Sequence, residues 1–172
     1  TVDPEWHVSD QQAQKMYQNL SRSINKNEPV ISDLDSSDSP IERIRMNDLF
    51  NHFVEEKLRL KLVDFDDLMF MFSLLLDSDE AYRQRWSERF IHILVDEYQD
   101  VNDLQARLID QLASYHGKVF AIGDHAQAIY GFRGANVDHF RRFCSRFENA
   151  EVHRLTTNFR STSNIVNAAE LL

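Results

Sequence analysis

Two polar clusters, each following a short apolar run, constrain this chain more than any other feature. The first run lies in residues 91–100 (IHILVDEYQD) and ends in Asp96 and Glu97, and the second, 118–122, ends in Gly123 and Asp124. Short β-branched runs of this kind are typical of buried strands in a parallel sheet. The sequence therefore predicts two strands, each with polar side chains at its carboxyl end.

The residues between the two runs predict a helix. Asn102 and Asp103 are suitable N-cap residues, Gly117 is a suitable terminator, and an apolar face is formed by Leu104, Leu108, Ile109 and Leu112. Strand, helix and strand fit within about 30 residues, the size of one βαβ unit. Ligands of open α/β sheets bind beyond the carboxyl ends of the strands. We therefore expect both polar clusters at one ligand-binding edge of the sheet.

The residue types in these clusters suit phosphoryl transfer. That chemistry needs a carboxylate for Mg²⁺, a group that orients the attacking water and donors to the γ-phosphate. Asp96 is placed for the metal and Glu97 for the water, and Gln127 is a neutral donor in the loop after the second strand. Taken alone, the Asp-Glu pair is explained equally well by a plain strand followed by an acidic helix start.

The loop at 121–135 (AIGDHAQAIYGFRGA) also carries two aromatic residues, Tyr130 and Phe132. From composition alone, these rings are equally consistent with a core position and with a surface on which nucleic-acid bases stack. The adjacent Arg133 is explained either by a structural ion pair or by coupling of this loop to the acidic pair.

Four ordered motifs resemble those of the UvrD/Rep-like superfamily 1 DNA helicases. DEYQD (96–100) and G-D-x-x-Q-x-I-Y-x-F-R-G-A (123–135) are similar to the second and third motifs of that family, and RLTTNFRSTSN (154–164) to the fourth. DFDDL (64–68) is similar to an acidic element that lies upstream of them. The match extends over roughly residues 60–172, so the chain resembles a central fragment of such a motor.

The resemblance implies an α/β fold with the parallel sheet of a RecA-like, P-loop NTPase type domain and an N-terminal helical subdomain. Residues 1–62 would be the end of the subdomain inserted in the first motor domain. Residues 63–148 would form the C-terminal half of that motor domain, and residues 149–172 the start of the second one.

The resemblance also implies ATP and Mg²⁺ as cofactors and assigns roles to single residues. Asp96 would hold Mg²⁺ through water, Glu97 would be the catalytic base, and Gln127 and Arg160 would contact the γ-phosphate. Phe159 would stack on adenine, where the family often has Tyr. Tyr130 and Phe132 would stack on DNA bases. The residues that would couple the nucleotide site to the DNA-binding loop are Arg133, Asp124, Gln99 and Asp100. Two further departures from the family pattern are Ala128, where Ser is common, and Thr157, where Gln or Glu is frequent.

We therefore expect part of an ATP-dependent DNA helicase or translocase that moves 3′→5′ on single-stranded DNA and unwinds duplexes at junctions. Its partners would be DNA and the rest of the parent chain. No G-x-x-x-x-G-K-[ST] phosphate-binding loop occurs in the sequence, so this stretch alone is expected to be inactive. A non-catalytic DNA-binding or scaffold module is the alternative. A nuclease built on Asp96, Glu97, Asp100 and Asp103 is disfavoured, because these carboxylates follow one strand–helix turn.

Composition sets wider bounds. The net charge of −9 argues mildly against a phosphate-binding surface, but most of the acidic residues precede residue 104. The single cysteine, Cys144, excludes an internal disulfide and fits a reducing, cytoplasmic location. No apolar run approaches the roughly 20 residues of a membrane span. The chain begins at Thr1 without an initiator Met and stops within a predicted helix, so we expect a piece of a longer protein.

The remaining pattern predicts mostly helices. One helix follows the capping residue Ser9, and its apolar face is Ala13, Met16, Tyr17, Leu20 and Ile24. A Ser- and Asp-rich loop at 28–40 precedes a second helix. Asp64 is a suitable cap for a third, with Asp66 and Asp67 in its first turn, although a direct chemical role for these aspartates stays open.

Residues 68–76 are apolar on nearly all sides and are expected to be buried, and a short helix is expected at 80–86. Residues 137–147 predict a helix with Phe140, Phe143 and Phe147 inward and Arg141, Arg142 and Arg146 outward. Residues 151–155 predict a strand.

Overall fold

The computed structural model describes residues 9–26, 40–147 and 149–169. These residues are mostly helical and contain one two-stranded parallel sheet. The predicted Ser- and Asp-rich loop lies outside them, apart from Pro40, which begins a helix. Among the described helices, none has the length and apolar character needed to cross a membrane.

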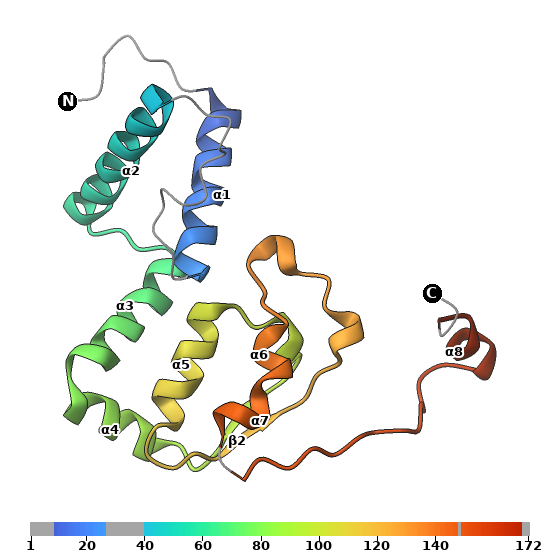
Figure 1. Cartoon of the computed structure of the whole chain (residues 1–172). Coiled ribbons are helices and arrows are strands. Elements are labelled where there is room, and N and C mark those ends of the chain that lie inside the picture. Colours follow the sequence, from blue (N-terminus) through green and yellow to red (C-terminus); the bar gives the residue numbers. More distant parts are fainter. Residues whose placement is uncertain (1–8, 27–39, 148, 170–172) are drawn as a thin grey trace.

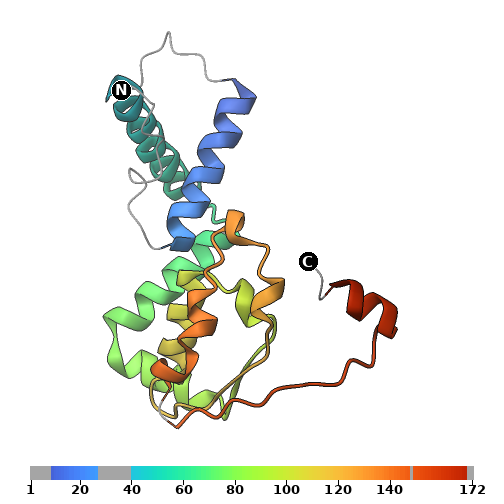
Figure 2. The same cartoon turned by 45° about the vertical axis from the view of Figure 1, so that its right-hand side comes forward.

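Helices α1 (Asp10–Lys26) and α2 (Pro40–Leu60) form an arm that projects from the rest of the chain (Figures 1 and 2). We call this pair the helical arm. The ring of Tyr17 in α1 meets the ring of Phe53 in α2 edge-on, with centroids 6.3 Å apart. Helix α1 contacts α3 and α5, and its last two turns contain three buried residues: Leu20, Ser23 and Asn25.

Helix α3 (Phe65–Ser78) begins where the sequence predicts, after Asp64. Asp64 Oδ1 accepts from the Asp67 amide and Asp67 Oδ2 accepts from the Asp64 amide, both at 2.9 Å. This reciprocal box satisfies two amides that a helix start otherwise leaves unpaired. Helix α4 (Glu80–Arg89) follows and contacts α3, and the Trp86 ring packs edge-on against Phe72.

The prediction that residues 68–76 are buried on nearly all sides is wrong. Only Ser73 and Leu76 of α3 are buried. Several of its apolar side chains are at least two-fifths exposed: Leu68, Met71, Leu74 and Leu75. The reason is that the helices in contact with α3 in the described part of the chain, α4, α5 and α1, leave these side chains uncovered.

The sheet is the predicted βαβ unit. Strands β1 (Ile93–Val95) and β2 (Val119–Ala121) pair in parallel, with Ile93 opposite Val119 and Val95 opposite Ala121. Helix α5 (Asp103–Ala113) is the crossover, and Asn102 caps it as predicted, in a box with Gln105. The buried centre of the core comprises Tyr98, Val101, Ala106 and Ile109.

Only one face of this sheet is covered by the described residues. Ile93 and Val95 pack on the core together with Val119 and Ala121, whereas Leu94, on the opposite face, is 74% exposed. Successive side chains of a strand point to opposite faces, so one covering layer buries only every second residue. The predicted fully buried strand is therefore buried on one side.

The helix predicted for 137–147 is interrupted. It forms two short pieces, α6 (Asp138–Arg141) and α7 (Phe143–Arg146), which meet at Arg142. The three phenylalanines of this segment pack against the core as predicted: Phe140, Phe143 and Phe147. Arg146 does not point outward, because it binds buried groups described below.

The predicted strand at 151–155 is not formed within residues 149–169. This segment runs away from the sheet as an extended chain, and helix α8 (Ser163–Ala169) stands apart from the other elements (Figure 1). A strand needs a partner for its backbone groups, and the described residues offer none here.

Candidate functional site

The carboxyl ends of the two strands meet at one edge of the sheet. Val95 and Ala121, the last residues of β1 and β2, are directly paired. Pairing continues beyond them, since Ile122 N donates to Val95 O and Tyr98 N donates to Ile122 O, both at 2.9 Å. The polar residues that follow each strand are therefore held side by side, as the sequence predicts.

Asp96 and Glu97 leave β1 in a sharp turn. Glu97 has φ 49° and ψ 44°, in the left-handed region that non-glycine residues seldom adopt. Such strain costs about 1–3 kcal/mol and persists where neighbouring contacts enforce it. One of these contacts is the hydrogen bond from the Glu97 amide to Asp96 Oδ1 at 2.9 Å. Both side chains are exposed and open to a ligand.

Gln99 links the acidic pair to the second strand end. Its side chain is 1% exposed, and its Nε2 donates to Glu97 Oε2 at 2.8 Å. Its Oε1 accepts from the backbone amide of Asp124 at 3.0 Å. One amide side chain thus fixes the Glu97 carboxylate relative to the loop after β2. Asp100, in the same turn, is half-buried, and its Oδ1 has no hydrogen-bond partner among the described residues.

Asp124 in turn positions Gln127. Asp124 caps the 3₁₀ turn His125–Gln127 by accepting from the Ala126 amide at 3.0 Å, and its other oxygen accepts from Gln127 Nε2 at 3.0 Å. The hydrogen bond from Gln127, followed by that from Ala126, lowers the pKa of Asp124, so this carboxylate stays ionised. The Gln127 amide nitrogen keeps a second hydrogen for another acceptor.

Gly123 is required for the close approach of these parts. A Cβ atom at this position would lie 2.6 Å from Gln99 Oε1 and 2.9 Å from the ring of Phe140. Both neighbours are fixed, because Gln99 is buried and Phe140 packs on the core. Only glycine allows the loop after β2 to run against the Gln99 amide.

The aromatic residues lie on the loop and outside the core. We call residues 128–135 the aromatic loop. Tyr130 is 37% and Phe132 65% exposed, and their ring centroids are 6.0 Å apart. The Arg133 guanidinium carbon lies 5.0 Å from the Tyr130 centroid and 5.4 Å from that of Phe132. In the described part of the chain, Arg133 therefore engages the two rings and makes no ion pair with Asp96 or Glu97.

The end of the aromatic loop is attached to the start of α5. Ala135 forms an antiparallel bridge with Asn102, and the Asn136 amide donates to Val101 O at 3.0 Å. Gly134 precedes this bridge with φ 91°, a conformation that L side chains rarely adopt. The end of the loop is thus anchored through Val101 and Asn102 to the turn that follows β1. Gln99, in the same turn, holds Asp124, which lies four residues before the loop begins.

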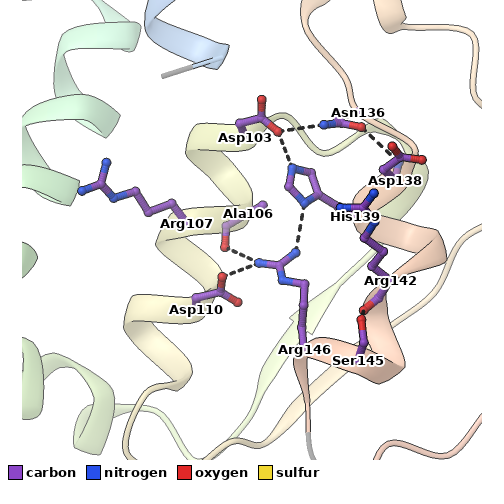
Figure 3. Close-up of a pocket in the computed structure, with 10 residues that line it drawn as sticks. All are labelled: Asp103, Ala106, Arg107, Asp110, Asn136, Asp138, His139, Arg142, Ser145 and Arg146. Atoms are coloured by element: carbon purple, nitrogen blue, oxygen red, sulfur yellow. Dashed lines mark hydrogen bonds and ion pairs between the residues drawn. The ribbon is translucent and has the colours of Figure 1, made fainter. Parts of the chain in front are cut away.

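A network behind the site, which sequence reasoning missed, involves Arg146 (Figure 3). Arg146 donates to Tyr98 Oη at 3.1 Å, to Ala106 O at 3.2 Å and to the Asp110 carboxylate, and it also contacts His139 Nδ1 at 3.1 Å. His139 Nε2 lies 2.5 Å from Asp103 Oδ1. The pattern of residues 137–147 gives no sign of this, because Arg146 reaches partners about 40 residues away.

Apart from Tyr98, the residues of this network line a shallow pocket of about 450 Å³ between α5 and the α6–α7 segment (Figure 3). Its charged groups largely pair with one another, since Arg146 bonds to Asp110 and Asp103 to both His139 and Asn136. We interpret this network as structural. It holds Tyr98, the neighbour of Glu97, against α5 and α7.

Phe159 and Arg160 are not brought to the acidic pair. Phe159 is 94% exposed, and Arg160 is exposed as well. Asn158 Oδ1 accepts from the amides of Arg160 and Ser161, both at 2.9 Å, so this turn has a defined local shape. The segment lies away from the sheet (Figure 2).

The site fits a metal ion that is held jointly by the protein and by a phosphate ligand better than one held by protein side chains alone. In the described residues, no group of three or more His, Cys, Asp or Glu side chains is arranged to hold a metal. Mg²⁺ is commonly held by one or two carboxylates together with waters and substrate phosphates. Asp96 suits that role, because the Glu97 amide occupies only its Oδ1 atom. Asp103, considered above for a nuclease site, is engaged by Asn136 and His139 instead.

Comparison with known proteins identifies the family of the chain. Residues 4–148 match the UvrD/REP helicase N-terminal domain. The chain is 41% identical over 139 residues to DNA helicase II of Escherichia coli (strain K12), which covers 81% of this chain and 19% of that protein.

Two further relatives carry the name ATP-dependent DNA helicase. Rep of Buchnera aphidicola subsp. Baizongia pistaciae (strain Bp) is 32% identical over 142 residues, 83% of this chain and 21% of Rep. PcrA of Leuconostoc citreum is 37% identical over 122 residues, 71% of this chain and 16% of PcrA. The chain spans about a fifth of the length of these relatives. With its match over residues 4–148, it belongs to the UvrD/Rep family of ATP-dependent DNA helicases.

Proposed function

We propose that this chain is the central part of a DNA helicase or translocase that couples ATP hydrolysis to 3′→5′ movement on single-stranded DNA. Residues 63–148 would be the C-terminal half of a RecA-like motor domain, and residues 1–62 the end of a helical subdomain inserted in it. Residues 149–172 would begin the second motor domain. The family match over residues 4–148 and the names of the relatives support this proposal.

The observation that carries the proposal is the position of Gln99. It bonds to the Glu97 carboxylate with one end and to the Asp124 amide with the other. Asp124 positions Gln127, and the aromatic loop begins at the next residue. Three successive hydrogen bonds therefore connect the Glu97 carboxylate to Gln127, which directly precedes the loop that carries Tyr130 and Phe132. This is the connection that coupling of hydrolysis to DNA binding requires.

Each residue of the nucleotide site has a distinct role in this proposal. Asp96 would hold Mg²⁺, which neutralises charge on the phosphate oxygens when bound. Glu97 would accept a proton from the attacking water, and the Gln99 bond keeps its carboxylate in one orientation. Gln127 would donate its second amide hydrogen to the γ-phosphate.

Phe159 and Arg160 would complete the nucleotide site from the second motor domain. Both side chains are exposed, as expected of residues that contact a ligand across a cleft and do not pack within their own segment. This step requires the segment after residue 148 to take a different position in the complete motor.

Tyr130 and Phe132 would provide the DNA-binding surface. Their exposed rings can stack on bases of any sequence, and stacking depends less on net charge than a grip on a duplex backbone does. The net charge of −9 is therefore compatible with binding to single strands. Duplex junctions and the rest of the motor are the other proposed partners.

The phosphate-binding loop expected of such a motor is absent from these 172 residues. We therefore expect that the fragment alone does not hydrolyse ATP, and the decisive test uses the full-length protein. Glu97→Gln should leave nucleotide binding intact and reduce steady-state hydrolysis by about 10²–10⁴-fold, because the side chain keeps its shape and loses the base. The matched control is Glu88→Gln in α4, an exposed carboxylate that accepts a hydrogen bond from the neighbouring Gln84 side chain. Near-normal hydrolysis by Glu97→Gln would refute Glu97 as the base.

A further inference from the structure

The end of the helical arm carries a buried asparagine whose contacts reach the aromatic loop. Asn25, in the last turn of α1, is 8% exposed. Its Nδ2 donates to Asp66 Oδ1 in α3 at 3.2 Å and to Ser21 Oγ at 3.3 Å. Its Oδ1 accepts from Asn102 Nδ2 at 2.9 Å. Two of the three hydrogen bonds of this amide therefore leave α1, one to α3 and one to the N-cap residue of α5.

Asn102 connects Asn25 to the end of the aromatic loop. Its own Oδ1 accepts from the Gln105 amide at 2.8 Å and so caps α5, while its backbone forms the bridge to Ala135. Gly134 lies against Asn25 directly, since a Cβ atom at Gly134 would be 3.6 Å from the Asn25 Cβ. The last turn of α1 thus lies next to the end of the aromatic loop at Gly134.

A second contact fixes the other helix of the arm. Lys57, near the end of α2, bonds to Asp64 at 3.0 Å and to Asp67 at 2.7 Å, and both carboxylates also form the cap of α3. Each of the three aspartates of DFDDL therefore has a partner in the arm, Asp66 in α1 and the other two in α2. These contacts give the acidic element a structural role that the sequence left open. We call the contacts of Asp64, Asp66 and Asp67 with Lys57 and Asn25 the joint between the arm and α3.

We propose that Asn25 is a positioning residue that sets the end of the aromatic loop relative to the helical arm. A displacement of α1 would then shift Gly134 and Ala135 and, with them, the rings that we propose bind single-stranded DNA. This inference deepens the proposed function and rests on it for the role of the rings. The physical link itself, from Asn25 through Asn102 to Ala135, is independent of any ligand.

A polarity swap separates this role from ordinary packing. Asn25→Asp keeps the size of the side chain and the acceptor for Asn102, but it places a carboxylate against Asp66. The double variant Asn25→Asp/Asp66→Asn restores a donor and an acceptor in this pair, with the direction of the hydrogen bond reversed. Asp66→Asn alone retains an acceptor for Asn25. If Asn25 contributed by its shape alone, the single and double variants would behave alike, because Asn and Asp side chains have nearly the same shape.

The first measurement is backbone hydrogen exchange in the 172-residue chain, followed at the Ala135 and Asn136 amides, which donate to Tyr130 O and Val101 O. We expect Asn25→Asp to accelerate their exchange about tenfold or more, because their local opening becomes easier. The double variant and Asp66→Asn should stay within about twofold of the unaltered chain. Exchange of the Ile93 and Ile122 amides, which donate hydrogen bonds between the two strand segments, reports whether the fold is intact. Gln18→Ala, an exposed amide in the same helix, is the matched control.

The second measurement is the affinity of the full-length protein for a fluorescent single-stranded oligonucleotide. Asn25→Asp should weaken binding about tenfold, and the double variant should restore it. Unchanged exchange at Ala135 and Asn136 in Asn25→Asp, or a double variant as impaired as the single one, would overturn the inference. If the unaltered protein fails to bind single strands, the proposed function fails, whereas the exchange comparison still decides the link through Asn25.

Discussion

Gln99 donates a hydrogen bond to Glu97 at 2.8 Å from a side chain that is almost completely buried. Glu97 is itself strained, with φ 49°, so the bond helps to hold a conformation that the backbone alone disfavours. The candidate base is thus exposed to a ligand and is fixed from behind by an amide that also contacts the second strand end.

Gln99→Leu should damage catalysis and stability together. The variant removes the Glu97 bond and leaves the Asp124 amide unpaired, which costs about 1–3 kcal/mol in the free energy of unfolding. In the full-length protein we expect kcat for ATP hydrolysis to fall about 10–100-fold, because the base loses its fixed orientation. Thermal denaturation and steady-state kinetics measure the two effects. Gln84→Leu, at an exposed position in α4, is the control, and a Gln99→Leu enzyme with unchanged kcat would contradict the proposed link.

Tyr130→Ala and Phe132→Ala should each weaken binding of single-stranded DNA by about 1–3 kcal/mol, because one stacking surface is lost. The loss should be similar for oligonucleotides of different base sequence, as measured by fluorescence anisotropy. The melting temperature should change little, since both rings lie outside the core. Ile129→Ala is a matched control in the same loop, because Ile129 is exposed and has no aromatic face. Unchanged affinity with a large fall in melting temperature would assign the rings to a structural role.

The joint between the arm and α3 should weaken in acid and in strong base. Burial alone would raise the pKa of Asp64, but hydrogen bonds from the Asp67 amide and from Lys57 hold it below its ordinary value of 3.8. A lowered carboxyl pKa contributes stability that is fully present above that value and is lost as the pH falls through the folded-state pKa. Burial alone would lower the pKa of Lys57, but its bonds to Asp67 and Asp64 raise it above 10.5. The contribution of Lys57 is present below that pH and is lost above it.

Lys57→Met tests this joint. At neutral pH it should lower the free energy of unfolding by about 1–3 kcal/mol, because the charge-assisted hydrogen bonds of Lys57 to the Asp64 and Asp67 carboxylates are lost. It should also reduce the acid dependence below about pH 4, because Asp64 then lacks the cation that lowers its pKa. Thermal denaturation from pH 2 to 8 measures both effects. Arg59→Met, which breaks an exposed pair with Glu56, should leave the melting temperature unchanged. A pH profile identical to that of the unaltered chain would show that Lys57 does not stabilise the joint.

Arg160→Lys should lower ATP hydrolysis in the full-length protein by roughly 10³–10⁵-fold, the contribution of arginine fingers elsewhere. The planar guanidinium can bind two phosphoryl oxygens at once, which the ammonium of Lys cannot do. DNA affinity and folding stability should stay nearly intact, because Arg160 is exposed and packs on nothing in the described chain. Arg154→Lys, an exposed arginine of the same segment, is the control. Turnover within a few-fold of the unaltered enzyme would leave Arg160 as an ordinary surface charge.

The sequence by itself determined the local features of this protein. The apolar runs, the Asn102 cap and Gly117 predicted the βαβ unit, because strand propensity, helix capping and turn formation depend on neighbouring residues. The parallel pairing then placed Asp96, Glu97 and Gly123–Asp124 at one edge, as expected. The cap at Asp64 was equally local. The motif order was enough to identify the family.

Only the tertiary structure decided which groups meet across the fold. The hydrogen bonds between Gln99 and Asp124, between Arg146 and Tyr98, and between Asn25 and Asn102 join residues 25 to 77 positions apart. The periodicity of the sequence therefore cannot predict them. The same reason explains the errors, since the exposed side of α3 and the absent strand at 151–155 both depend on partners that neighbouring residues cannot supply. Local sequence fixes the conformation of a segment, whereas burial and hydrogen bonding depend on what packs against it.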